Sequence, residues 1–140
     1  MPNVVVDANV VVSAALKPNS VPERAIRLAY GHDVICLSER VLAEFEQVLS
    51  RPKFRHPGWS ERREEILDVL LAAAAFFDHG ETVTVCSDEK DNIYLELALA
   101  AEVIISGDRD LLDLDHWRGI RILRPVQYLE HVVSRPAQRR

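Results

Sequence analysis

The chain has 140 residues, of which 48% are hydrophobic and 28% are charged. These proportions are ordinary for a soluble globular protein, and the length suits one domain. They exclude a disordered chain, a collagen-like repeat and a disulfide scaffold. The 22 acids outnumber the 17 Lys and Arg, which gives a net charge of −5. This balance argues against a protein that coats nucleic acid through bulk charge, but not against one that contacts it through a bound cation.

The sequence lacks the usual signs of a membrane or secreted protein. Its longest apolar stretch, residues 66–77, contains Asp68 and is too short to cross a bilayer. No charged-then-apolar leader opens the chain. Cys36 and Cys86 lie within apolar runs, where we expect small buried side chains and no disulfide. We therefore expect a cytoplasmic protein with no membrane partner.

Strands and helices are predicted to alternate along the chain. Short apolar or β-branched runs predict five strands, at 4–6, 34–37, 82–85, 103–105 and 120–123. Capping residues and helical spacing predict helices at 20–30, 38–51, 60–77, 88–101 and 125–133, with a short helix or turn at 108–115. This alternation is typical of an α/β protein, here a three-layer α/β/α sandwich with a mostly parallel five-stranded sheet.

Several details of this organisation are open to test. Gly31 is expected to end the first helix, and residues 51–59 are expected to form a loop. The helix at 60–77 is apolar around much of its girth and should be largely buried. The next helix should turn its apolar side chains inward, namely Ile93, Leu95, Leu97, Ala98 and Leu99. We expect one domain over residues 1–134 and a frayed basic tail over 135–140.

Carboxylates follow the predicted strands. They are Asp7 directly after the first strand, Glu44 in the helix after the second, Asp88 and Asp91 after the third, and Asp108 and Asp110 after the fourth. The carboxyl ends of parallel strands meet at one edge of a sheet, where ligands bind. Helix capping would explain single acids among these, but it does not explain why they converge.

Converging carboxylates raise one another's pKa unless a cation holds them ionised. A set of oxygen ligands with no His or Cys suits Mg²⁺ or Mn²⁺. Such ions activate water and stabilise the leaving oxygen in phosphodiester cleavage. The sequence therefore predicts metal-assisted phosphoryl chemistry.

Four segments in order resemble the PIN (PilT N-terminus) domain family: VVVDANV at 4–10, SERVLAEF at 38–45, DEKDN at 88–92 and IISGDRDLL at 104–112. The resemblance spans about residues 3–130 and is greatest for the subgroup of toxins from toxin–antitoxin systems. It implies an α/β/α sandwich and a Mg²⁺- or Mn²⁺-dependent endoribonuclease, with RNA as substrate, an antitoxin protein as partner and a homodimer as assembly.

The resemblance also assigns roles to individual residues. Asp7 and Asp91 would be the main metal ligands, with Asp108 or Asp110 completing the shell through water. Glu44 would orient or deprotonate the attacking water. The implied catalytic set is Asp7, Glu44, Asp91 and Asp108, and the polar residues that support it are Asn9, Asn92, Ser106 and Asp88, the last being a ligand or a helix cap.

The densest basic stretch consists of Arg51, Lys53, Arg55, Arg62 and Arg63. It is a candidate contact for the RNA backbone, and the alternative is a solvated loop and helix face. Trp59 beside it would stack a base or fill a gap in the packing.

Two other functions fit parts of the sequence. The first is a PIN domain that binds RNA or a protein partner without cleaving. The second is a phospho-receiver-like signalling module, which shares the strand–helix alternation, an acid after the first strand and a basic-Pro step at Arg124-Pro125. Against the second, Asp7 has no adjacent acid and Cys86-Ser87 follows the third predicted strand, where a receiver needs a phosphorylatable Asp.

Overall fold

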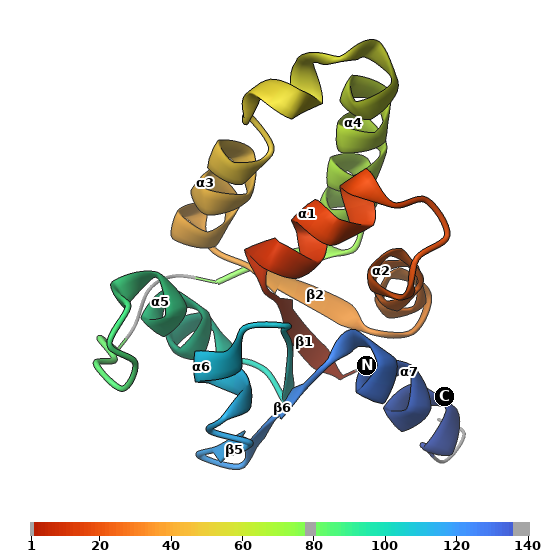
Figure 1. Cartoon of the computed structure of the whole chain (residues 1–140). Helices are drawn as coiled ribbons and strands as arrows, with labels where there is room; N and C mark the ends of the chain where they lie inside the picture. Colours follow the sequence, from red (N-terminus) through yellow and green to blue (C-terminus); the bar gives the residue numbers. More distant parts are fainter. Residues whose placement is uncertain (1, 78–80, 136–140) are drawn as a thin grey trace.

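The computed structural model describes residues 2–77 and 81–135. Its sheet has the strand order β3-β2-β1-β4-β6-β5, with helices on both faces (Figure 1). The strands are β1 (Asn3–Val6), β2 (Val34–Leu37), β3 (Ala74–Phe76), β4 (Val103–Ile105), β5 (His116–Trp117) and β6 (Ile120–Leu123). All neighbours are parallel except β5 and β6. The α/β class and the mostly parallel sheet are confirmed, but the sheet has six strands and not five.

The helices lie in two unequal layers. They are α1 (Ala8–Leu16), α2 (Val21–His32), α3 (Glu39–Val48), α4 (Pro57–Ala72), α5 (Glu89–Ala98), α6 (Arg109–Leu112) and α7 (Pro125–Ser134), with a 3₁₀ turn at Pro52–Arg55. Helix α2 lies against α1, α4 and α7, whereas α5 lies against β1, β2 and β4. Helix α3 contacts both α1 and α5. No helix in the described residues is long and apolar enough to cross a membrane.

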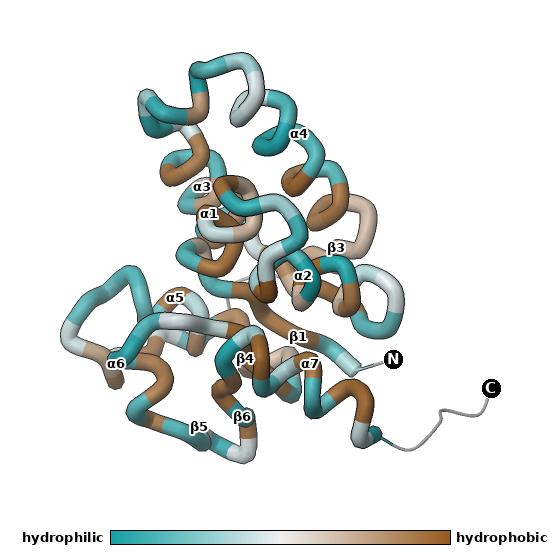
Figure 2. Tube along the Cα trace, turned by 45° about the vertical axis from the view of Figure 1, so that its right-hand side comes forward, coloured by the Kyte–Doolittle hydropathy of each residue, from teal (hydrophilic) through white to brown (hydrophobic). Residues whose placement is uncertain are grey.

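The central strand is buried on both faces, as the sequence predicts. Val4, Val5 and Val6 are each at most 1% exposed. Figure 2 shows hydrophobic strands β1 and β4 at the centre of the molecule, between the helical layers. Parallel strands read as continuous apolar runs because helices cover both of their faces.

The predicted strand at 82–85 is wrong. Helix α5 supplies acceptors for the backbone donors that a strand would use: Glu96 Oε2 accepts from Val83 N–H at 2.8 Å, and Asn92 Oδ1 accepts from Val85 N–H at 3.2 Å. The third strand in chain order is instead β3, at the sheet edge, where Ala75 pairs with Cys36. Acids Asp88 and Asp91 therefore do not directly follow a strand.

The helix expected at 60–77 is shifted and shorter. It begins at Pro57, which occupies the first turn, as proline prefers, and it ends at Ala72. Only one side is buried, through Ile66, Leu67 and Leu70. Residues 51–59 are therefore a 3₁₀ turn and a helix start in place of a loop. Leu99, expected to point inward, is 40% exposed because it caps the end of α5.

Other features also differ from the sequence prediction. Helix α1 was not predicted and begins directly after Asp7. Helix α2 passes through Gly31 and ends at His32. Arg135, placed in the frayed tail, donates to the buried carboxylate of Asp33 at 2.9 Å. The rest of that tail, residues 136–140, lies outside the described residues.

The order of the parallel strands also bears on function. If the antiparallel strand β5 is left out and the other strands are numbered in chain order, the order across the sheet is 3-2-1-4-5. The direction of the connections reverses between β1 and β4. A flavodoxin-like receiver has the order 2-1-3-4-5. The observed order therefore excludes the receiver fold. Ligands bind in α/β sheets at the carboxyl ends of strands where the order reverses.

Candidate metal centre

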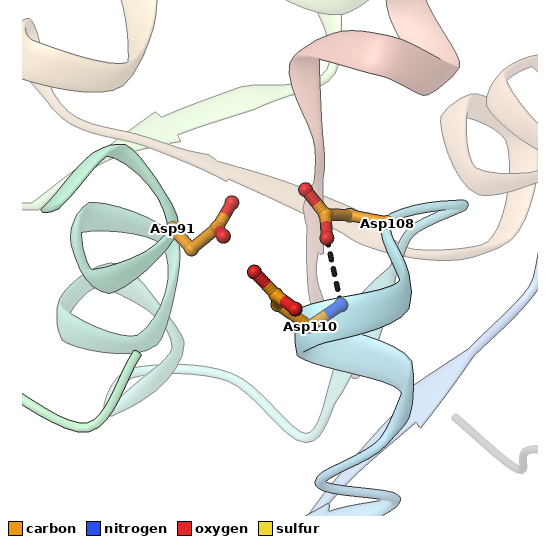
Figure 3. Close-up of side chains that lie close together, drawn as sticks. All are labelled: Asp91, Asp108 and Asp110. Atoms are coloured by element: carbon orange, nitrogen blue, oxygen red, sulfur yellow. Dashed lines mark hydrogen bonds between the residues drawn. The ribbon is translucent and has the colours of Figure 1, made fainter. Parts of the chain in front are cut away.

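Three carboxylates converge beside this reversal point. Asp91 lies in the first turn of α5, and Asp108 and Asp110 lie at the start of α6. Each offers one oxygen within 4.8 Å of the others. Figure 3 shows the three side chains pointing toward one another from the two helices. A cation between them would have an all-oxygen ligand set.

The acids are held in place by helix capping. Asp108 caps α6, where its Oδ1 accepts from the backbone N–H of Asp110 at 2.8 Å (Figure 3). Asp7 caps α1, where its Oδ1 accepts from the backbone N–H of Asn9 at 3.4 Å. The same aspartates can therefore cap helices and converge. The hydrogen bond to the helix start fixes the orientation of each carboxylate, and these helix starts lie next to one another.

Asp7 is 3% exposed, and its carboxylate lies near enough to Asp108 for the two charges to interact. Its Oδ2 accepts from the hydroxyl of Ser106 at 2.7 Å. Burial raises the pKa of Asp7, the hydrogen bond from Ser106 opposes that effect, and the charge of Asp108 adds to it. Asp7 is not among the carboxylates whose oxygens meet within 4.8 Å. The structure thus brings Asp91, Asp108 and Asp110 together directly, while Asp7, predicted as a leading ligand with Asp91, is linked to Asp108 through the hydroxyl of Ser106.

The electrostatics of the cluster fit a cation. The pKa of Asp91 is raised to about 7, first by burial and then by the charge of Asp108 and a hydrogen bond with it. Asp88 and Asp7 contribute in the same direction. Acids that raise one another's pKa are stabilised in their charged form by a bound cation. The donor set therefore suits Mg²⁺ or Mn²⁺.

Glu44 reaches the same region from α3. It is half-buried, and burial raises its pKa. A hydrogen bond with Tyr94 lowers this pKa, while the charge of Asp7 raises it. Tyr94 is 1% exposed and was absent from the sequence prediction. Tyr94 lies three residues after Asp91 on α5, and residues at this spacing are neighbours on the surface of a helix. This spacing is the sequence signal by which Tyr94 could have been placed near the acids.

The predicted supporting residues behave differently from one another. Ser106 contacts two acids, because its hydroxyl oxygen also accepts from the backbone N–H of Asp108 at 2.9 Å. Asn92 has no side-chain hydrogen bond to an acid among the described residues. Its side chain instead holds the backbone of Cys86, at 2.8 Å through Oδ1 and 3.0 Å through Nδ2. Asn9 is exposed and contributes its backbone N–H. Asp88 is an exposed cap of α5 that accepts from Lys90 N–H at 2.9 Å.

Both cysteines are free. Cys36 is fully buried in the sheet, as predicted, and burial raises the pKa of its thiol to about 12. Cys86 is only half-buried and lies beside the acids: burial, then the charges of Asp91 and Asp110, raise its pKa.

The basic stretch divides into two groups. Arg62 and Arg63 are structural: Arg62 donates to the buried Glu23 at 2.8 Å and Arg63 donates to the carbonyl of Leu49 at 3.0 Å. The other group consists of Arg51, Lys53 and Arg55, which form no ion pair among the described residues. They lie on the 3₁₀ turn between α3 and α4, with Trp59, 40% exposed, just beyond.

The fold and the site together define an α/β sandwich that gathers acidic side chains at its topological reversal point. The PIN domain family model matches residues 3–110. The chain therefore belongs to the PIN domain family, as the sequence resemblance implied.

Known proteins that are similar to this chain include one found by sequence and one found by structure. An uncharacterized protein of Methanocaldococcus jannaschii is 31% identical over 114 residues, which cover 79% of this chain and 74% of that protein. A chain in the crystal structure of VapBC2 from Rickettsia felis, bound to a DNA fragment from their promoter, has a TM-score of 0.59 with 16% identity. That match covers 87% of this chain and 98% of the other. At this identity the second comparison concerns the fold.

Proposed function

We propose that this chain is a metal-dependent endoribonuclease and the toxin of a toxin–antitoxin pair. The observation that carries the proposal is the cluster of Asp91, Asp108 and Asp110, with an oxygen of each within 4.8 Å of the others. Membership of the PIN domain family and the buried Asp7 beside this cluster support it.

In this proposal each acid has its own role. Asp91, Asp108 and Asp110 bind the ion, and Asp7 helps to position Asp108 through the hydroxyl of Ser106. A Mg²⁺ or Mn²⁺ ion bound there would polarise the scissile phosphate and lower the pKa of an attacking water. Glu44 accepts the proton of that water, since burial keeps its pKa above the ordinary value.

The RNA strand would contact the tip between α3 and α4. Arg51, Lys53 and Arg55 lie within five residues that carry no acid, in a chain of net charge −5. Such a local excess of cations attracts the phosphate backbone. The tip lies beyond the end of α3 and away from α5 and α6 (Figure 1), so an RNA that contacts both needs several nucleotides.

The proposed partners are an antitoxin protein and a second copy of this chain, in the cytoplasm. The antitoxin is supported by the similarity in fold to a chain of VapBC2. The homodimer is supported by apolar side chains on α7, where Val126 is 47% and Val133 83% exposed. Light scattering of the purified protein tests the dimer, and host growth on expression of the wild type against Asp91→Asn tests toxicity.

The central experiment is digestion of single-stranded RNA by the purified protein with Mg²⁺, with Mn²⁺ and with EDTA. We expect internal cleavage that needs the metal. Asp91→Asn and Asp108→Asn should abolish it while circular dichroism shows an intact fold. Asp68→Asn, an exposed acid of α4, is the matched control and should cleave normally.

RNA that stays intact under all metal conditions would contradict the nuclease proposal. If the same intact RNA is nonetheless retained in a binding assay, the alternative of a non-catalytic RNA-binding PIN domain takes its place. Cleavage that persists in Asp91→Asn would show that the activity comes from elsewhere.

A further inference from the structure

Tyr94 lies where three helices meet. It is carried by α5, is 1% exposed, and accepts the backbone N–H of Ala8, the first residue of α1, at 3.2 Å. Its hydroxyl is also hydrogen-bonded to Glu44 on α3. One phenolic oxygen, carried by the middle of α5, thus joins the start of α1 to the middle of α3.

The directions of these two hydrogen bonds are fixed by chemistry. A phenol has one proton to donate and can accept at its oxygen. The backbone N–H of Ala8 can only donate, so the phenol accepts there. Its own proton is therefore free for the carboxylate of Glu44. The N–H of Ala8 belongs to the first turn of α1, where no helical acceptor exists, so this arrangement also satisfies a donor of the helix start.

Glu44 needs such an anchor more than the aspartates do. Its side chain has more rotatable bonds than Asp, and fixing it has an entropic cost. Asp7 and Asp108 are each fixed by backbone N–H groups at helix starts. Glu44 lies mid-helix, where backbone N–H groups are already used, and within the described part of the chain its side-chain hydrogen bond is with Tyr94.

We propose that Tyr94 is a positioning residue, which holds the carboxylate of Glu44 toward the acid cluster in the geometry needed to accept a proton from water. The proposal rests on the proposed ribonuclease function. Tyr94 itself does not touch substrate. Misplacement of a catalytic group by about 1 Å can lower a rate by roughly 100-fold, so a residue that fixes one angle of Glu44 affects turnover directly.

The test compares two tyrosines. Tyr94→Phe keeps the ring and removes the hydroxyl. Tyr128→Phe is the matched control, because Tyr128 is also fully buried and also donates to a carboxylate, that of Asp33, but on α7. We expect Tyr94→Phe to lower kcat by roughly 10- to 100-fold with KM within about twofold of wild type. Tyr128→Phe should lower the Tm and leave kcat unchanged.

A double variant then shows whether the effect passes through Glu44. In the Glu44→Gln background, Tyr94→Phe should lower kcat no further, since residues that act as a unit are not additive. A measurement without turnover completes the test. In the metal-free wild type, the Tyr94 hydroxyl proton should give a slowly exchanging NMR resonance that moves in Glu44→Gln. This readout holds even if Tyr94→Phe does not fold.

The outcomes separate this inference from the function on which it rests. If the wild type cleaves RNA but Tyr94→Phe has normal kcat, or if the loss in the double variant is additive, the positioning role is wrong and the nuclease stands. A hydroxyl resonance unaffected by Glu44→Gln overturns it as well. If the wild type cleaves nothing, the proposed function falls, and the positioning role falls with it.

Discussion

The hydroxyl of Ser106 donates to Oδ2 of Asp7 at 2.7 Å, across the end of two neighbouring strands. The same oxygen accepts the backbone N–H of Asp108 at 2.9 Å. Ser106 is fully buried, so neither bond competes with bulk water. One hydroxyl therefore sets the spacing between the acid after β1 and the acid after β4.

Ser106→Ala should weaken metal binding and cleavage while the fold persists. Loss of the hydrogen bond raises the pKa of Asp7 further and frees the turn that carries Asp108. Residues that orient metal ligands typically change affinity by about 10- to 100-fold when removed, and we expect a loss in that range. Titration calorimetry with Mn²⁺ measures it. Ser106→Thr keeps the hydroxyl and should retain more affinity; equal losses in both variants would point to packing and not to the hydrogen bond.

The acid cluster should make stability depend on pH and metal. The pKa of Asp91 is about 7 in the native protein, above the 3.8 of an isolated Asp side chain. Between these values the native state retains a proton that the unfolded chain has lost, so the free energy of unfolding falls as the pH rises. For Asp91 this fall should be on the order of 1–3 kcal/mol between about pH 4 and pH 7.

Urea denaturation in EDTA at about pH 5 and about pH 8 measures this dependence. Asp91→Asn lacks the titrating group, so its free energy of unfolding should fall less than that of the wild type between the lower and the higher pH. Mn²⁺ at the higher pH should raise the Tm of the wild type more than that of Asp91→Asn, because it binds the native state with the full cluster. Equal pH slopes in the two proteins would show that Asp91 titrates normally.

The cations of the tip between α3 and α4 predict a salt-dependent contribution to RNA binding. Replacing Arg51, Lys53 or Arg55 by Gln should each reduce the slope of log Kd against log salt by about 1, if each contacts one phosphate. The effect should appear in KM and leave kcat unchanged. Arg24→Gln removes an exposed cation from α2 and should leave the slope as it is. An unchanged slope in all three tip variants would assign RNA binding to another surface.

Much of the site could be predicted because it depends on local signals. Asp7 and Asp108 follow apolar runs that are buried on both faces, and both runs are strands of the sheet. The parallel pairing of Val6 with Ile105 then brings the two acids to the same edge. A pattern of this kind places residues by strand order alone, without knowledge of side-chain contacts.

The sequence predictions that were wrong concern features that depend on tertiary contacts. Residues 82–85 are all β-branched and alternate Thr with Val, which is typical of a strand. No strand forms because Glu96 and Asn92 of α5 accept the backbone N–H groups that would pair in a sheet. Ala74 and Ala75 have low strand propensity, yet they pair with β2 because the core leaves that edge open. Tyr94 was missed for the same reason: a tyrosine within a helix looks like a core residue until the acceptors around its hydroxyl are known.

The end of α7 is fixed by a buried carboxylate, and this predicts a stability effect apart from the active site. Asp33 accepts from the hydroxyl of Tyr128 and from Arg135 at 2.9 Å, and its side chain is 0% exposed. Arg135→Ala leaves that charge with one partner fewer, which should cost about 1–3 kcal/mol in the free energy of unfolding. Asp33→Asn should partly relieve this cost in the Arg135→Ala background, since an amide has no charge to compensate. Urea denaturation measures both, and RNA cleavage well below the Tm should match wild type because Asp33 caps the end of α2, a helix that lies away from α5 in Figure 1. A loss of cleavage in folded Arg135→Ala would mean that α7 communicates with the acid cluster.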